Sequence, residues 1–485
     1  MERLGERAGR IYLYLLATVL LLAAPFTASG GGYGHITAFK AGVYAVLTGA
    51  FLLFSLPGLP LREIVHSPWR LCALGYLGWS LLSALCSPWK QTAFFGSGRQ
   101  EGFIILLLYV CSFLLLSVRR VRSEWLLPVF GLSLLLLDGA CLLQLSGRDP
   151  LGLYPAGMCW QDANLRYPGS YLGTVGNAGL TCAVLGTAAA VFFRAILVRG
   201  ERSWLLLPVL LLDLRVLGEA NVSAPVLGFC AAALLSLLCC EPALTMLCRW
   251  CSLSCACLPM LLALRLPVRV LFPMLLLAWV FYLLSRYIPE RPLRRASLLC
   301  LTLALLLFFV GFLLRYDGYG IPLREASELL HGSVSDSMGS GRIYIWKQVL
   351  GAVPEHLWLG TGPDTLGLRE LEPYIWEAEA AGITVSSRID AAHNEILHTL
   401  VCQGLPAAVF HFSLFVCALV QFIRRRRSDA GVCASGAVCY AVQAMFGISA
   451  AASAPLFWVL LALSLNPQFQ GGQSHGAGPV FQHKD

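Results

Sequence analysis

The sequence has little charge for its length. Only 13% of its 485 residues are Asp, Glu, Lys or Arg, 57% are hydrophobic, and the mean hydropathy is +0.70. Soluble domains carry about 25% charged residues, so this chain lacks the polar surface that a water-soluble domain needs. Long apolar runs such as IYLYLLATVLLLAA and ASLLCLTLALLLFFVGFLL approach the ~20 residues that cross a ~30 Å hydrocarbon core. The composition predicts a polytopic membrane protein.

The sequence also lacks the cysteine spacing of a disulfide framework or a zinc site. Nearly all of its 18 cysteines fall within apolar runs, and those of CRWCSLSCAC crowd a membrane segment, where they are more typical of packing residues. The net charge of +8 comes from basic residues scattered between the apolar runs. That distribution excludes a nucleic-acid-binding patch.

The arginines predict how the spans are oriented. Alternate loops contain MERLGERAGR, LREIVHSPWR, RRVR, RGER, RPLRR and RRRR, whereas the loops between them are glycine-rich, aromatic and poorer in arginine for their length. Arginine-rich loops face the cytoplasm, so we expect both termini there. The predicted fold is an all-α polytopic membrane protein with about 12–14 transmembrane helices and one large, partly helical extracytoplasmic loop.

This topology divides the chain into four parts. They are N-terminal transmembrane helices with short external loops (1–315), a large extracytoplasmic catalytic loop (316–402), C-terminal transmembrane helices (403–465) and a disordered cytoplasmic tail (466–485). The large loop has about 87 residues, far more than the usual 2–8 residues between helices. Its stretch SGRIYIWKQVLGAVPEH predicts a helix over about residues 340–353, which Pro354 would end.

The segment DAAHNEILHTLVCQG (390–404) suggests three kinds of site. A zinc helix of the H-E-x-x-H type is excluded, because His393 and His398 are five residues apart and would diverge by ~140° on a helix. A structural interpretation has Asp390 capping a helix whose first turn contains Glu395. A functional interpretation has His393 transferring protons near neutral pH. The residues alone leave these last two open, and no metal is expected.

Three arginines in the predicted external loops favour an anionic ligand. Arg99 lies in GSGRQEGF, Arg166 in NLRYPGSYLGTVGN and Arg342 in SGRIYIW, among glycines and aromatic residues. A lone arginine at such a position often has no ligand and simply extends its charged end to the membrane interface. Three on one side, with a guanidinium geometry that suits phosphate, indicate a ligand such as a pyrophosphate. The stretches GTVGN and LGTGPDTLG are weak phosphate-loop look-alikes without a Walker lysine.

Taken together, these motifs resemble a known family. SGRIYIWKQVLGAVPEHLWLGTGPDTLG followed by AAHNEILHTLVCQGLPA resembles the signature of the O-antigen ligase and polymerase superfamily. Upstream, GSGRQEGF and YPGSYLGTVGNAGLTCAVL are similar to its Arg-x-x-Gly and Gly-Thr-x-Gly-Asn segments. The resemblance is strongest over residues 337–408, and the order of the segments agrees over 94–408.

The resemblance implies a membrane glycosyltransferase of the bacterial cytoplasmic membrane. Such an enzyme transfers or polymerises glycan from an undecaprenyl-pyrophosphate-linked donor to a glycan or lipid acceptor, on the outer face and without metal or other cofactor. His393 is similar to the family's loop histidine, the candidate base, and Arg342 to its loop arginine. The substrate-binding residues that the resemblance implies are Arg99, Arg166, Asn177 and Asn394.

Some alternatives stay open. GLPA, with Ala407, and RIYIW, with Trp346, depart from the ligase pattern, so a polymerase or a ligase with another acceptor is possible. A lipid-linked oligosaccharide flippase or other polytopic transporter is the main alternative, and a membrane structural or receptor protein is a third. The oligomeric state and the roles of Asp138 and Asp213, within apolar spans, are undetermined.

Overall fold

Helices dominate the structure. The computed structural model describes residues 2–469, apart from 26–31, 57–60, 155–159, 162–164, 167–170, 200, 221, 263–267, 317–320, 379–382 and 427. The described residues are 74% helical and contain only two short antiparallel hairpins. The predicted all-α polytopic class is therefore confirmed, whereas most of the predicted tail lies outside the described residues.

The helices follow one another closely along the chain. The N-terminal part contains α1 (Glu2–Leu15) with a following π-helical turn (Leu16–Leu20), α2 (Tyr33–Ser55), α3 (Leu61–Val65), α4 (Pro68–Cys86), α5 (Lys90–Phe95), α6 (Phe103–Val118) and α7 (Leu126–Leu145). The middle contains α8 (Ala178–Arg199), α9 (Leu207–Glu219), α10 (Ser223–Cys239), α11 (Leu244–Leu262), α12 (Val268–Tyr287) and α13 (Arg295–Leu313). The C-terminal part contains α14 (Ile321–Leu330), α15 (Met338–Ala352), α16 (Glu395–Gln403), α17 (Leu405–Arg424), α18 (Asp429–Ala444) and α19 (Ala454–Leu465).

Seven of the described helices are long and apolar enough to cross a membrane. They are α2, α7, α8, α11, α12, α13 and α17, and three shorter apolar helices, α6, α10 and α19, accompany them. Multiple spanning helices agree with the predicted class. The predicted number of about 12–14 spans stays a prediction.

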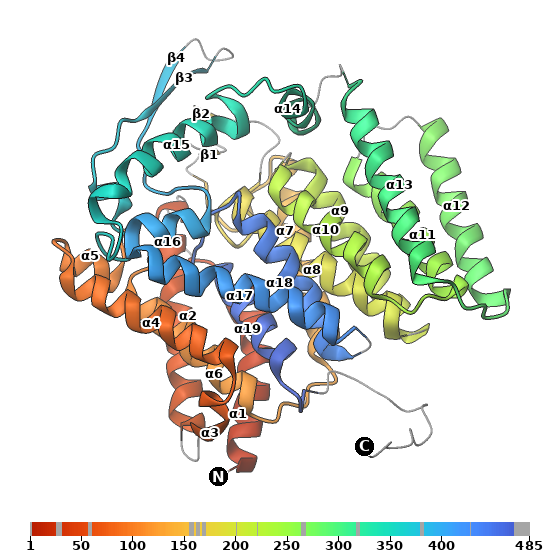
Figure 1. Cartoon of the computed structure of the whole chain (residues 1–485), viewed down its shortest axis with the longest axis horizontal. Coiled ribbons are helices and arrows are strands. Elements are labelled where there is room, and N and C mark those ends of the chain that lie inside the picture. The colour runs from red at the N-terminus through yellow and green to blue at the C-terminus, as the bar shows by residue number, and fades with distance from the viewer. Residues whose placement is uncertain are drawn as a thin grey trace.

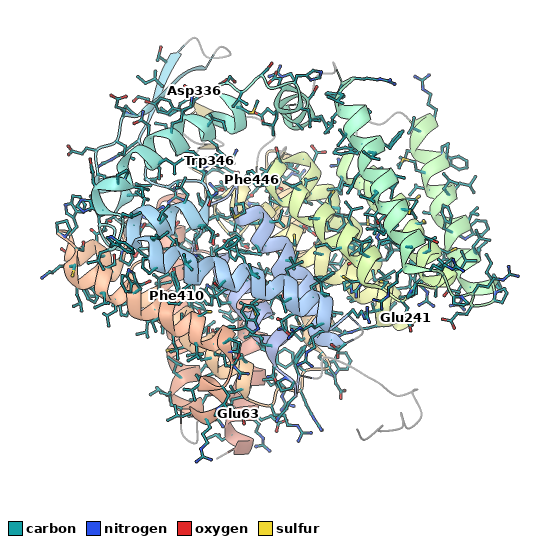
Figure 2. All side chains as sticks on the ribbon, viewed as in Figure 1. Glu63, Glu241, Asp336, Trp346, Phe410 and Phe446 are labelled. Carbon is teal, nitrogen blue, oxygen red and sulfur yellow. The ribbon has the colours of Figure 1, made fainter. Side chains whose placement is uncertain are left out.

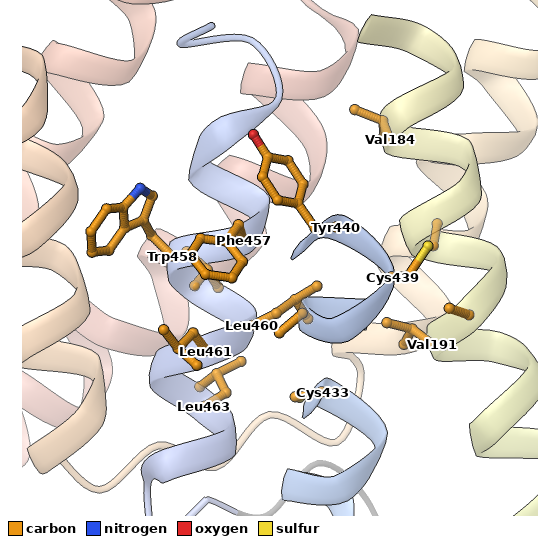
Figure 3. Close-up of a cluster of buried hydrophobic side chains, with 14 of the residues drawn as sticks. Val184, Val191, Cys433, Cys439, Tyr440, Phe457, Trp458, Leu460, Leu461 and Leu463 are labelled. Atoms are coloured by element: carbon orange, nitrogen blue, oxygen red, sulfur yellow. The ribbon is translucent and has the colours of Figure 1, made fainter. Parts of the chain in front are cut away.

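Helices α8, α18 and α19 form the centre of the bundle. Of the spanning window of α8, 89% is buried. Small residues let the helices approach closely: a Cβ on Gly228 of α10 would lie 2.5 Å from the carbonyl oxygen of Cys439 on α18. Figure 3 shows Val184 and Val191 of α8 facing this α18–α19 core. By contrast, only 11% of α12 and 17% of α13 is buried, as expected of helices that face lipid.

Residues 316–402 lie at one end of the bundle and the N-terminus lies at the other (Figure 1). This segment contains α14, α15, a hairpin of β3 (Tyr374–Ala378) and β4 (Ile383–Ser387), and α16. The predicted helix over 340–353 is confirmed as α15, and Pro354 starts a separate 3-10 turn. The beginning of α15 departs from helical geometry, because Gly339, Ser340 and Gly341 have positive φ. The four-part division of the chain stays a prediction.

The stretch LGTGPDTLG is a packing turn between this segment and the membrane helices. A Cβ on Gly360 would lie 2.2 Å from the carbonyl of Cys402, and Gly362 N donates to the Cys402 carbonyl over 2.7 Å. Ser87, at the end of α4, donates through Oγ to the carbonyl of Thr361 over 2.6 Å. These glycines are therefore explained by the close contact of the turn with α16 and α4, not by a phosphate.

Candidate active site

A polar pocket opens among the helix ends next to the 316–402 segment. It is lined by side chains of α4, α6, α16, α17 and α19 and by the segments that connect them. The charged and histidine side chains of its lining are Arg99, Glu101, Asp364, His393, Glu395, His398 and His411. Ionisable groups concentrated in one recess of a mostly apolar chain indicate a functional site.

His393 enters this pocket from a strained backbone. Its φ is +48°, in the left-handed region that non-glycine residues rarely adopt. The next residue, Asn394, is the N-cap of α16: its Oδ1 accepts a hydrogen bond of 2.9 Å from the backbone N–H of Leu397. The expectation that Asp390 caps this helix is therefore wrong. His393 lies just outside the helix, because Asn394, a better cap than histidine, sets where the helix begins.

Asp390 instead forms an ion pair with Arg99. Arg99 Nη2 lies 2.8 Å from Asp390 Oδ1, and the Arg99 side chain is 15% exposed. This pair joins the loop before α6 to the segment before α16, although the two residues are far apart in the sequence. Burial raises the pKa of Asp390, but the charge and hydrogen bond of the Arg99 guanidinium outweigh it and hold that pKa below its usual value. Arg99, predicted from its motif, thus lies in the same pocket as His393.

Arg342 lies beside this pocket, on the first regular turn of α15. Its Nε donates to the carbonyl oxygen of Phe446 over 2.9 Å, and its Nη1 donates to that of Gly339. Trp346, one turn later, donates through Nε1 to the carbonyl of Ala392 over 2.9 Å. Figure 2 shows Trp346 and Phe446 close together at this end of the bundle, with ring centroids 6.2 Å apart. These contacts fix α15 against the segment that carries His393.

The two arginines set the electrostatics of His393. Burial, followed by the positive charges of Arg99 and Arg342, lowers the pKa of His393 to about 3. The imidazole is therefore neutral at physiological pH. A neutral imidazole can accept a proton, but a pKa this low makes it a weak base while the site is empty.

The structure does not bring Arg166 and Asn177 into this pocket's described lining. Arg166 belongs to β2 (Leu165–Arg166), which pairs with β1 (Trp160–Gln161), and its side chain lies outside the described residues. Asn177 precedes α8, and its Oδ1 accepts a hydrogen bond of 3.2 Å from the backbone N–H of Leu180. This helix-capping contact by itself explains why an asparagine stands at position 177. Its predicted role, like that of Arg166, stays a prediction.

Three pocket residues were missed or misjudged from the sequence. His398 was expected to point away from His393, but both line the same pocket. The helical-wheel argument fails because His393 precedes the helix. Glu395 was interpreted as an ordinary first-turn residue, yet it is 7% exposed and its Oε1 accepts a hydrogen bond of 2.8 Å from Tyr440. Glu101 was not predicted to have a role, and its Oε1 accepts a hydrogen bond of 2.6 Å from Tyr109.

Both glutamates have unusual proton affinities. Burial, followed by the charge of Glu101, raises the pKa of Glu395 to about 8. Burial is also the largest cause for Glu101, whose pKa rises to about 7. Carboxyls that titrate near neutral pH in a pocket suit acid–base chemistry. Among the described residues, no group of three or more His, Cys, Asp or Glu side chains could hold a metal ion.

Comparison with protein families identifies this region. Residues 252–412, which include Arg342, His393 and Glu395, match the family model described as O-antigen ligase. The chain carries an O-antigen ligase domain. The resemblance predicted from the motifs is thus confirmed over this segment, and the match supports a membrane enzyme of the O-antigen ligase or polymerase type. A comparison with curated proteins found no match.

Proposed function

We propose that this O-antigen ligase-type enzyme transfers or polymerises glycan from an undecaprenyl-pyrophosphate-linked donor. The reaction would take place on the outer face of the bacterial cytoplasmic membrane, with a glycan or lipid as acceptor. The observation that carries the proposal is that Arg99 and His393, far apart in the sequence, line one pocket, and that the positive charge of Arg342 also acts on His393. The pocket offers both positive charge and a proton acceptor.

The chemistry assigns a separate task to each group. An acceptor hydroxyl attacks the anomeric carbon of the donor, and the bond from that carbon to the pyrophosphate oxygen breaks. His393 takes the proton of the hydroxyl, while Arg99 and Arg342 stabilise the negative charge that develops on the leaving pyrophosphate. Two guanidinium groups can do this by charge-assisted hydrogen bonds, without a metal ion.

Two substitutions test these roles in the full-length membrane protein. His393→Ala and Arg342→Ala should each abolish glycan transfer while leaving membrane insertion and yield unchanged. The matched controls are His356→Ala and Arg324→Ala, which lie in the same segment at exposed positions and should retain activity. Full activity of His393→Ala would refute the assignment of the base.

The glycan profile of a deletion strain would decide between the two subtypes. Loss of chain length would indicate a polymerase, and loss of attachment to the acceptor would indicate a ligase. A flippase would instead leave the lipid-linked glycan on the cytoplasmic face when the protein is deleted. Asp138 and Asp213 are completely buried in α7 and α9 and do not line the pocket around His393. They therefore give no support to a transport path through this site.

A further inference from the structure

The pocket of His393 contains two carboxyl groups that have no role in the reaction proposed above. Glu101 lies just before α6 and Glu395 is the first residue of α16, yet both line the same pocket. Each is held by a tyrosine hydroxyl of a neighbouring helix, Glu101 by Tyr109 of α6 and Glu395 by Tyr440 of α18. Neither forms an ion pair with a described residue. Two buried carboxyls are thus fixed in position by hydroxyl groups rather than by ion pairs.

The proton that His393 accepts cannot stay there at low cost once the pyrophosphate has left. An imidazolium would lie near the positive charges of Arg99 and Arg342, which already disfavour that form. Asp390, the carboxylate nearby, pairs with Arg99 and does not line the pocket. The site therefore needs a second proton acceptor.

Asp364 is already engaged in hydrogen bonds with the backbone. Its Oδ2 accepts hydrogen bonds from the backbone N–H of Ser97 over 2.6 Å and of Glu101 over 3.2 Å. This carboxylate organises the loop that carries Arg99. Within the described lining of the pocket, Glu101 and Glu395 are therefore the carboxyls left to take a proton.

We propose that Glu101 and Glu395 act as a carboxyl pair that receives, through His393, the proton released by the acceptor hydroxyl. This inference rests on the proposed glycosyl transfer. The hydroxyl O–H bond breaks as the oxygen attacks the anomeric carbon, and the imidazole nitrogen takes the proton. The imidazole then passes it to the ionised carboxylate of the pair, which becomes a neutral acid. The electron pair of the broken carbon–oxygen bond leaves with the pyrophosphate.

The proton affinities of the pair fit this task. With the pKa of Glu101 at about 7 and that of Glu395 at about 8, the pair holds one or two protons near neutral pH. The charge of Glu101 raises the pKa of Glu395, so the titration of one carboxyl depends on the other. Both act through His393, so they are positioning and proton-accepting residues rather than groups that touch the reacting carbon.

Other titratable groups that face the pair come from the helices packed around it. Besides the arginines, aspartates and tyrosines named above, they are Tyr76 of α4, His398 of α16 and His411 of α17. Burial lowers the pKa of His398 to about 4, so this imidazole carries no charge between pH 5.5 and 9. An inflection in that range that moves in Glu101→Gln therefore reports on the glutamate pair rather than on His398.

The test uses glutamine, which mimics a protonated carboxyl in size and hydrogen bonding but cannot accept the proton. The purified full chain in nanodiscs would be assayed with a lipid-pyrophosphate-linked glycan and its acceptor. For wild type, kcat should rise with pH to a plateau above about pH 8, because the ionised acceptor is lost below the pKa of the pair. The double variant Glu101→Gln/Glu395→Gln should lose about 10²-fold in kcat, with the donor KM within about threefold of wild type.

A single variant should also shift the pH dependence of kcat, which loss of a purely structural contact would not do. In Glu101→Gln the inflection should move to lower pH, because Glu395 loses the repulsion of a neighbouring carboxylate. Glu372→Gln, at an exposed position, is the matched control and should show the wild-type profile.

Two results would overturn the inference. One is a double variant with the kcat of wild type. The other is a wild-type kcat that does not change between pH 5.5 and 9, a result that does not depend on any variant folding. If wild type itself transfers no glycan, the proposed function fails instead, so the two failures are distinguishable.

Discussion

The left-handed backbone of His393 allows its chemistry to be separated from its contribution to folding. At φ +48°, a non-glycine residue costs about 1–2 kcal/mol relative to its ordinary conformations. His393→Gly removes this strain, while the greater freedom of glycine in the unfolded chain costs about 0.5–1 kcal/mol. The two effects leave the variant as stable as wild type or up to about 1.5 kcal/mol more stable. Loss of the proton acceptor should lower kcat by about 10²–10⁴-fold.

The assay compares thermal stability with turnover for the same preparations. The apparent melting temperature of His393→Gly in detergent should equal or exceed that of wild type, while glycan transfer is lost. His393→Asn is the matched variant, since asparagine tolerates the left-handed region but is not basic; it should fold and be equally inactive. A glycine variant that retains turnover would refute the role of the imidazole. One that melts well below wild type would refute the strain argument.

Three further predictions concern other parts of the site. Arg342→Lys keeps the charge but loses the fork that donates to the carbonyl oxygens of Phe446 and Gly339. Transfer should fall by about 10–10²-fold, and a wild-type kcat would contradict this. Gly404→Ala would place a Cβ 1.9 Å from the carbonyl oxygen of Trp358, at a backbone φ of +88°. This variant should therefore fail to accumulate in membranes. The control Gly42→Ala, with nothing within 4 Å of its Cβ position, should accumulate like wild type. Treatment with EDTA should leave transfer unchanged, and inhibition reversed by added metal would contradict the proposed metal-free mechanism.

The sequence allowed the helical class, the helix over α15 and the family to be predicted because each depends on local patterns. Apolar runs identify membrane segments, and Pro354 marks the end of a helix. The role of Glu395 could not be predicted in this way. Its position next to a capping asparagine is ordinary, and only the packing of α18 shows that it is buried beneath Tyr440.

The error on His398 has a different cause. Its direction relative to His393 depends on where α16 begins, and helix boundaries are uncertain by a few residues from sequence. With Asn394 as N-cap, the preceding residue turns back into the left-handed region. Both imidazoles then line one pocket. A shift of the helix start by a few residues thus decides which side chains share a site.

The pairing of Arg99 with Asp390 bears on when His393 becomes a base. Asp390 is 58% exposed, so the pair is worth no more than about 1 kcal/mol. A pyrophosphate with two or more negative charges can therefore replace Asp390 at Arg99 at little cost. Once bound, that anion offsets the two positive charges that, after burial, depress the pKa of His393. We expect the proton affinity of His393 to rise only when the donor is bound. His393 is then a weak base in the empty site and a stronger base when the bond between the anomeric carbon and the pyrophosphate is ready to break.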